Sequence, residues 1–138
     1  MIIQKKLSFS TKGFNDIIDI TPSLKSHLNE SSLKNGNILV FVPGATGGLT
    51  TTEFEPGLLK DIPELLEKLI PMSENYHHDN TWHDGNGYAH LRATLIGPSI
   101  TIPFMDGTMQ LGTWQQVIFI DFDNRPRQRE LHLQIYGE

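Results

Sequence analysis

Residues 116–136, QVIFIDFDNRPRQRELHLQIY, decide the fold class of this chain. They predict two strands, over residues 116–122 and 128–136, which are joined by a charged turn. In this region Arg125, Arg127 and Arg129 follow Asp121 and Asp123. We expect these opposite charges to neutralise one another across the turn, with a forked anion clamp as the alternative. The stretch therefore favours a strand-rich fold with mostly antiparallel pairing.

Further elements are predicted on the N-terminal side of this stretch. Apolar residues that recur every three to four positions over residues 58–69 predict an amphipathic helix, which Pro71 ends. A shorter helix begins at Thr21-Pro22-Ser23 and stops by Asn35-Gly36. The other predicted strands are residues 3–9, 38–42, 49–54, 89–96 and 99–104, with a hairpin signal at Asp106-Gly107. We therefore expect one α+β domain over residues 1–138, a mostly antiparallel sheet or sandwich with two main helices.

Composition excludes several classes of function. A chain of 138 residues can bury about two thirds of its surface in one core, so it needs no metal or disulfide to fold. The absence of cysteine excludes thiolate metal sites and cysteine nucleophiles. A net charge of -5 argues against nucleic-acid and anionic-membrane partners, which need a basic surface. No signal peptide or membrane span is predicted, so we expect a cytoplasmic protein.

A histidine-rich segment is the main candidate for chemistry. His77, His78, His83 and His90 lie within fourteen residues, and residues 73–88 form a long segment without apolar periodicity. Such loops are usually functional, and the glycines at 85 and 87 permit tight turns that would bring His78, His83 or Asp84 toward His90. Imidazoles beside carboxylates suit either a divalent cation or acid/base catalysis. The alternative is a solvated loop whose histidines bond to backbone carbonyls. The candidate catalytic residues are His83, Asp84 and His90, and the candidate metal ligands are His78, His83, His90 and Glu53.

Residues around this segment could bind a substrate. If residues 89–96 form a strand, His90 and Arg92 share its polar face, and Arg92 could clamp an anion. Trp82 could stack on a flat ring or anchor the loop. The turn at residues 44–48 could form a small phosphate nest, although it lacks the GK[ST] ending of a phosphate loop; a plain turn is the alternative. The candidate substrate-binding residues are Arg92, Trp82, Asn86, Gly47, Gly48 and Gln115.

Several of these motifs together resemble the YjbQ family. They are WHDGNG at 82–87, AHLRA at 89–93, GPS at 97–99, LGTWQQ at 111–116, DFD at 121–123 with RPR at 125–127, and the final GE. The resemblance implies an α+β fold, small homotrimers and a weak secondary thiamine-phosphate synthase activity. The matching polar positions are Glu53, Asp61, His78, Asp84, His90, Trp114 and Gln115. Many members carry a His-Thr-Ser step where this chain has Pro43-Gly44-Ala45-Thr46. The missing histidine suggests a branch with a different substrate.

The implied reaction joins a pyrimidine diphosphate to a thiazole phosphate. It needs a divalent cation, cationic phosphate donors and an aromatic surface. Glu53, Asp79 or Asp84 could bind the cation together with imidazoles. Arg92 could hold the phosphates, and Trp82 or Trp114 could provide the aromatic surface. The prediction is a metal-assisted enzyme, with Mg²⁺, Mn²⁺ or Zn²⁺, that acts on small phosphorylated heterocycles. The alternatives are a non-catalytic binder of phosphometabolites or metal, and a metal-dependent phosphoester hydrolase.

Overall fold

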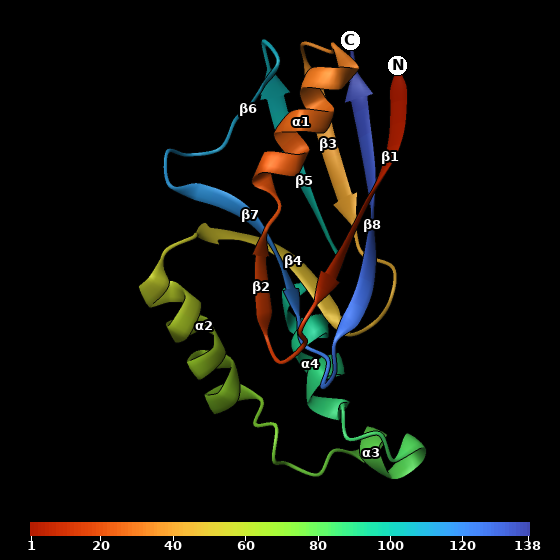
Figure 1. Ribbon diagram of the computed structural model, residues 1–138, viewed down its shortest axis with the longest axis vertical. Helices are drawn as coiled ribbons and strands as arrows, with labels where there is room; N and C mark the ends of the chain where they lie inside the picture. Colours follow the sequence, from red (N-terminus) through yellow and green to blue (C-terminus); the bar gives the residue numbers. More distant parts are fainter.

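Two antiparallel sheets form the centre of the protein in the computed structural model, which describes residues 1–138 (Figure 1). In spatial order, the first sheet contains β1 (Ile2–Thr11), β8 (Arg127–Gly137), β3 (Gly36–Phe41), β5 (Ser99–Met105) and β6 (Thr108–Met109). The second contains β2 (Asp16–Asp19), β7 (Gln115–Asp121) and β4 (Gly47–Glu53). The helices are α1 (Thr21–Ser31), α2 (Pro56–Leu69), α3 (His77–Trp82) and α4 (Gly87–Ile96). The predicted α+β class is confirmed.

Residues 116–136 supply an interior strand to each sheet: β7 is the middle strand of the second sheet, and β8 lies between β1 and β3 in the first. Strand β8 pairs with β1 along ten residues, from Ile2 opposite Tyr136 to Thr11 opposite Arg127. Along β8, side chains alternate between the core and solvent, as expected for a strand with one covered face. Residues 117–120 of β7 are all buried, because β7 has a core on each face. Val117 and Phe119 belong to the core beneath the first sheet, and Ile118 and Ile120 to a smaller core beneath the helices.

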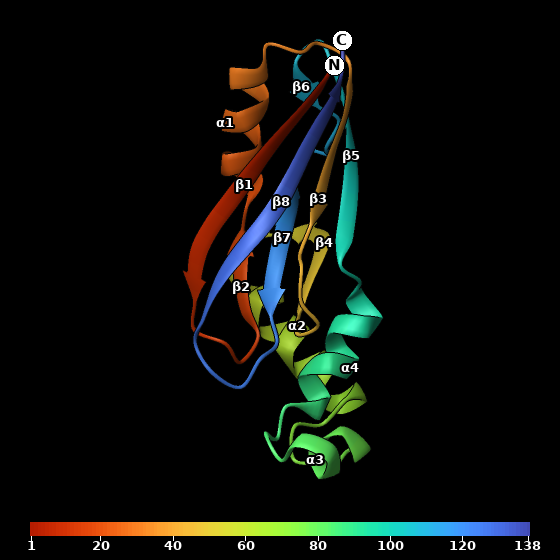
Figure 2. The same ribbon diagram turned by 90° about the vertical axis from the view of Figure 1, so that its right-hand side faces the viewer.

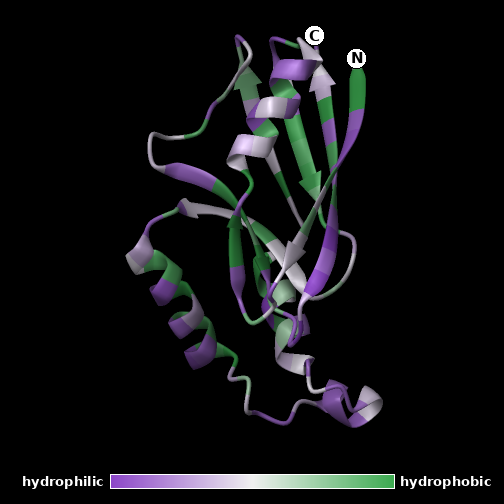
Figure 3. Ribbon diagram, in the orientation of Figure 1, coloured by the Kyte–Doolittle hydropathy of each residue, from purple (hydrophilic) through white to green (hydrophobic).

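Helix α1 begins where the sequence predicts, and α2 begins at Pro56, two residues before the predicted range. Pro22 occupies the first turn of α1, and Leu24 and Leu28 of this helix are buried in the larger core. The carboxylate of Glu55 accepts hydrogen bonds from the first backbone N–H groups of α2 and thereby caps it. Polar and apolar segments alternate along α2, whereas α3 is mainly polar (Figure 3). Leu66 of α2 is buried in the smaller core.

The strand predicted over residues 89–96 is wrong, because this segment is helix α4. The alternation of Leu91, Ala93 and Leu95 suggested a strand, but Leu91 and Leu95 are exposed. The buried positions are instead 88, 89, 92 and 93, which share one face of a helix. The segment expected to be an irregular loop also contains a helical turn and a half, α3, so the chain has four helices rather than two.

The short helices lie at one end of the molecule and the chain termini at the other. Figure 2 shows α3 and α4 beyond the ends of the sheets, opposite the N- and C-termini. The amino group of Met1 donates to the carbonyl oxygen of Gly137, so the two ends of the chain are joined. No helix is long and apolar enough to cross a membrane. The histidine-rich segment therefore lies at the edge of the fold.

Candidate functional site

The α3–α4 junction brings two imidazoles together. The rings of His78 on α3 and His90 on α4 have centroids 4.2 Å apart and planes inclined by 39°. Asp79 fixes this approach, because its Oδ2 accepts from the backbone N–H of Tyr76 at 3.1 Å and its Oδ1 from that of Gly87 at 2.9 Å. A Cβ on Gly87 would lie only 2.8 Å from Cβ of Tyr76, so glycine is needed where the helices meet. We call His78, Asp79, Asp84 and His90 the imidazole–carboxylate site.

His78 places an unpaired nitrogen at this site. Its Nδ1 is buried without a hydrogen-bond partner, 3.7 Å from Oδ1 of Asp84 and 3.9 Å from Oδ1 of Asp79. His83, with φ of 58°, ends α3 in the left-handed region and turns the chain back. The carbonyl oxygen of Asp84 then accepts from Nδ2 of Asn124 at 2.8 Å, which holds this turn. One ligand atom each from His78, Asp79 and Asp84 lies within 4.8 Å of the others, a spacing compatible with one cation.

His90 has an imidazole that favours the neutral form. Partial burial, and next the neighbouring His78, lower the pKa of His90 below its ordinary value of 6.5, although nearby carboxylates act in the opposite direction. At neutral pH its ring therefore retains a nitrogen lone pair. Such a nitrogen can accept a proton or bind a metal.

Asn86 lies between two carboxylates. One end of its side-chain amide is 3.3 Å from Oδ1 of Asp123. The other end is 3.0 and 3.2 Å from the two carboxylate oxygens of Asp84. An amide has one nitrogen and one oxygen, so it can donate to only one of these carboxylates. Its carbonyl oxygen must face the other.

A buried charge network lies directly behind the site. Arg129 forms a forked pair with Asp121, with Nε–Oδ2 and Nη2–Oδ1 distances of 2.8 Å, and both side chains are buried. Arg127 pairs with Asp123 at 2.9 Å. Thr46 joins the two pairs, since its hydroxyl accepts from Arg129 and donates to Asp123. The predicted charge pairing across the turn is thus confirmed for Arg127 and Arg129.

Asp123 should make folding pH-dependent. Burial alone would raise the pKa of Asp123, but hydrogen bonds from the Asn124 backbone, Asn86 and Thr46 outweigh it. The charge of Arg127 adds to them, and the pKa falls below its ordinary 3.8. A lowered folded-state pKa contributes stability above the unfolded-state pKa, which is lost as pH falls through the folded-state value.

We therefore expect the D123N variant to melt at a lower temperature than the wild type at neutral pH. The difference should narrow below the ordinary pKa of 3.8, where the wild type itself loses this contribution. Melting curves by circular dichroism from neutral pH to about pH 2 measure it. Parallel curves for the two proteins over this whole range would contradict the assignment.

Arg92 is part of the structural framework rather than an exposed clamp. It is fully buried, and its Nε and Nη2 donate to the carbonyl oxygen of Ile70. Nη1 donates to Oδ1 of Asn15 at 3.0 Å, and Nη2 to Oε2 of Glu67 at 2.8 Å. The guanidinium also lies 4.9 Å from the ring centroid of Tyr88. Arg92 therefore ties α4 to the end of α2 and to the β1–β2 turn, and the expected anion clamp has no unoccupied face.

The glycines expected to form a phosphate nest lie inside strand β4. A Cβ on Gly47 would be 2.6 Å from the Phe119 ring, and one on Gly48 would be 2.9 Å from a methyl group of Ile96. Close packing therefore explains both glycines. Their backbone belongs to the β4–β7 ladder, not to an anion-binding turn.

The remaining candidate residues are not drawn into the imidazole–carboxylate site. Trp82 and Trp114 are 70% and 72% exposed, so neither is core. Oε1 of Gln115 accepts from the Gly112 backbone in the preceding loop, and Nε2 donates to Thr51 on strand β4. Exposed polar candidates outside the cluster of ligand atoms are His77, His83, Glu53 and Asp61. Glu53 ends β4, the strand that leads to α2. It is not among the residues whose ligand atoms gather at His78.

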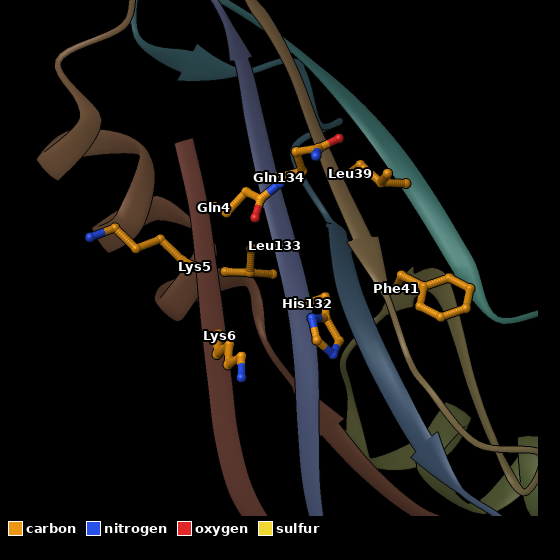
Figure 4. A pocket seen from close by; sticks show the side chains of 8 residues that line it. All are labelled: Gln4, Lys5, Lys6, Leu39, Phe41, His132, Leu133 and Gln134. Carbon is orange, nitrogen blue, oxygen red and sulfur yellow. The ribbon is translucent and has the colours of Figure 1, made fainter. Parts of the chain in front are cut away.

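A hollow of the surface lies elsewhere. It measures about 590 Å³ and lies on the outer face of β1, β8 and β3 (Figure 4). The amino group of Lys5 points away from the ring of Phe41 in this view, and Lys6 pairs with Glu130 at 3.4 Å. Its polar groups do not converge, so volume alone does not make it a reaction site. The polar groups that do converge are those at the α3–α4 junction.

Comparison with known proteins gives the family. Residues 5–138 match the family model described as "UPF0047 protein YjbQ-like". A UPF0047 protein of Archaeoglobus fulgidus is 40% identical over 126 residues, which cover 91% of this chain and 95% of that protein. The UPF0047 protein YugU of Bacillus subtilis is 30% identical over 135 residues, covering 96% of this chain and 98% of that protein.

Solved structures agree with this match. A YbjQ-like protein of unknown function from Sulfolobus solfataricus superposes with a TM-score of 0.94 at 29% identity, covering 100% of this chain and 99% of that one. A YjbQ/UPF0047 protein from Clostridium acetobutylicum gives 0.87 at 34% identity, covering 96% and 99%. The resemblance seen in the sequence motifs is confirmed, and the chain belongs to the UPF0047 (YjbQ-like) family.

Proposed function

We propose that this protein is a metal-assisted enzyme acting on a small phosphorylated metabolite, with its reaction centre at the imidazole–carboxylate site. The observation that carries the proposal is the buried, unpaired Nδ1 of His78, which faces the carboxylates of Asp84 and Asp79. A buried polar atom without a partner is costly, and a bound cation would relieve that cost. The donor set contains imidazole nitrogen and carboxylate oxygen, which suits Mn²⁺, Mg²⁺ or Zn²⁺.

The residues of the site would divide the work. His78 and Asp84 would hold the cation, whereas both oxygens of Asp79 already bond to backbone N–H groups and hold the helices together. When bound, a divalent cation would offset the negative charge of a phosphoryl group. His90, beside His78 and neutral at neutral pH, would accept a proton from the substrate. Because Arg92 is fully engaged, the phosphate would be held by the cation rather than by a guanidinium.

Thiamine-phosphate synthesis is the substrate assignment that the family resemblance implies, and it remains part of the proposal. The second candidate is a binding module without turnover. The structure offers one observation in its favour: neither Arg92 nor the Gly47–Gly48 backbone can clamp a phosphate, so the phosphate donors that synthesis requires are missing. Homotrimer formation also belongs to the proposal. Exposed Trp82, Trp114 and Leu95 support it, because a neighbouring subunit could cover them.

Metal titration of two histidine variants tests the reaction centre. We expect one equivalent of Mn²⁺ or Zn²⁺ to bind per chain, and H78A to weaken binding by at least about 10-fold because a ligand is lost. The control is H77A, which removes the adjacent exposed imidazole and should bind metal as the wild type does. Calorimetric titration measures both. A wild type that binds no divalent cation, or an H78A variant that binds as tightly, would refute the metal centre.

Assays with the metal-loaded protein then separate enzyme from binder. Formation of thiamine phosphate from its two precursors, or phosphate release from small phosphoesters, should depend on the metal and be lost in H78A. Tight precursor binding without any product would favour the binding module.

A further inference from the structure

The position of Asn86 between Asp84 and Asp123 restricts how its amide can turn. If the nitrogen faced Asp84, the carbonyl oxygen would face Oδ1 of Asp123 at 3.3 Å. Asp123 is 1% exposed, so this contact between two oxygens would be unscreened by water. If the nitrogen faces Asp123, the carbonyl oxygen of Asn86 faces the carboxylate of Asp84 instead. The side chain of Asp84 is 49% exposed, so water can screen this contact. The second orientation is less costly.

This orientation is reinforced from behind. Asp123 lies against Thr46 and Arg127, and all its nearest polar partners donate to it. Asp123 is therefore a carboxylate surrounded by hydrogen-bond donors, and the Asn86 nitrogen is one of them. With its nitrogen committed there, the Asn86 carbonyl oxygen lies 3.0 and 3.2 Å from the two oxygens of Asp84. Oxygens that approach this closely without a shared proton repel one another, and a cation between them converts the repulsion into coordination.

We propose that Asn86 is a metal ligand through its side-chain carbonyl oxygen, and that Asp123 is the positioning residue that turns this oxygen toward Asp84. The inference rests on the metal centre proposed above and extends it from two ligands to three. It also specifies the chemical class of the metal. A carbonyl and a carboxylate beside one imidazole favour a hard cation such as Mn²⁺ or Mg²⁺, because Zn²⁺ prefers nitrogen and sulfur donors.

The test compares two metals in two matched variants. N86L keeps the approximate shape of the side chain and removes its oxygen, whereas N80L makes the same change at an exposed position of α3. We expect N86L to weaken Mn²⁺ binding by at least about 10-fold and Zn²⁺ binding by clearly less, so that the ratio of the two affinities shifts toward Zn²⁺. We expect N80L to leave both affinities unchanged. Calorimetric titration at fixed pH measures all four affinities.

The outcomes separate this inference from the proposed function. No loss of Mn²⁺ affinity in N86L would overturn the ligand role of Asn86 and leave the His78 centre intact. Equal losses for Mn²⁺ and Zn²⁺ would overturn the assigned preference for a hard cation. A wild type without affinity for either metal would overturn both the ligand role and the His78 centre. Should N86L fail to fold, wild-type protein labelled with ¹³C at the asparagine side-chain carbonyl answers the same question. Mn²⁺ should broaden the Asn86 signal before those of Asn75 and Asn80; a sharp Asn86 signal at full metal occupancy would overturn the inference.

Discussion

Replacing Arg129 with methionine is expected to lower the free energy of unfolding by about 3–5 kcal/mol, because the change leaves a buried charge without its partner. Asp121 is fully buried, and both of its oxygens accept from the Arg129 guanidinium. The Thr11 hydroxyl also donates to Asp121, but a hydroxyl cannot neutralise a carboxylate. Urea denaturation followed by circular dichroism measures the loss. R129M should therefore be the most damaging single change considered for this protein.

A matched control is available four residues away along the same turn and strand. Arg125 is exposed, so R125M removes the same charge from an open position and should change stability by less than about 0.5 kcal/mol. Removing both charges, in a D121L/R129M double variant, should recover part of the lost stability, since no unpaired charge then remains. An R129M variant as stable as R125M would show that the forked pair contributes little to folding.

Replacing Arg92 with methionine should lower the free energy of unfolding by about 2–4 kcal/mol, because it leaves three partly buried acceptor groups without their donor. The carbonyl oxygen of Ile70 would lose two hydrogen bonds, and Asn15 and Glu67 one each. The same denaturation experiment measures this effect. Phosphate affinity, measured by titration under folding conditions, should be the same in R92M as in the wild type.

The result discriminates between the two roles considered for Arg92. A phosphate clamp would produce the reverse pattern, with stability retained and phosphate affinity lost. E67Q is the control, because its side chain is half exposed and glutamine keeps an oxygen that can accept from Arg92. We expect E67Q to remain within about 1 kcal/mol of the wild type, as surface ion pairs contribute little.

The longer strands and the two longer helices could be predicted because each is encoded by neighbouring residues, whereas the short strand β2 was not predicted. The β-branched run in β7 and the proline that opens α1 are local signals. Helix α4 was missed because Leu91, Ala93 and Leu95 alternate like a strand, while its helical face is formed by Tyr88, Ala89, Arg92 and Ala93. An arginine on the inner face of a helix is recognised as buried only when its partners are known.

Those partners lie far away in the sequence, which limits what any local pattern can reveal. Arg92 bonds to Asn15, 77 residues earlier, and Thr46 bonds to Asp123, 77 residues later. The meeting of His78 with His90 could be predicted, because only eleven residues separate them and two of these are glycines. The position of the Asn86 amide between two carboxylates could not be predicted, since one of the two, Asp123, follows β7 and lies 37 residues away in the sequence.

The attachment of the short helix α3 has a consequence for engineering and for divergence within the family. Its firm links to the rest of the protein are few: the Asp79 carboxylate to Gly87, and the stacked ring of His78. Substitutions at its solvent-facing positions, such as Asn80 and Thr81, should therefore be nearly neutral for folding. Change at the end of β7 would disturb the core and the Asn86 contact together. The solvent-facing surface of α3 can therefore vary among relatives while His78, Asp79 and the buried charges behind them remain constrained.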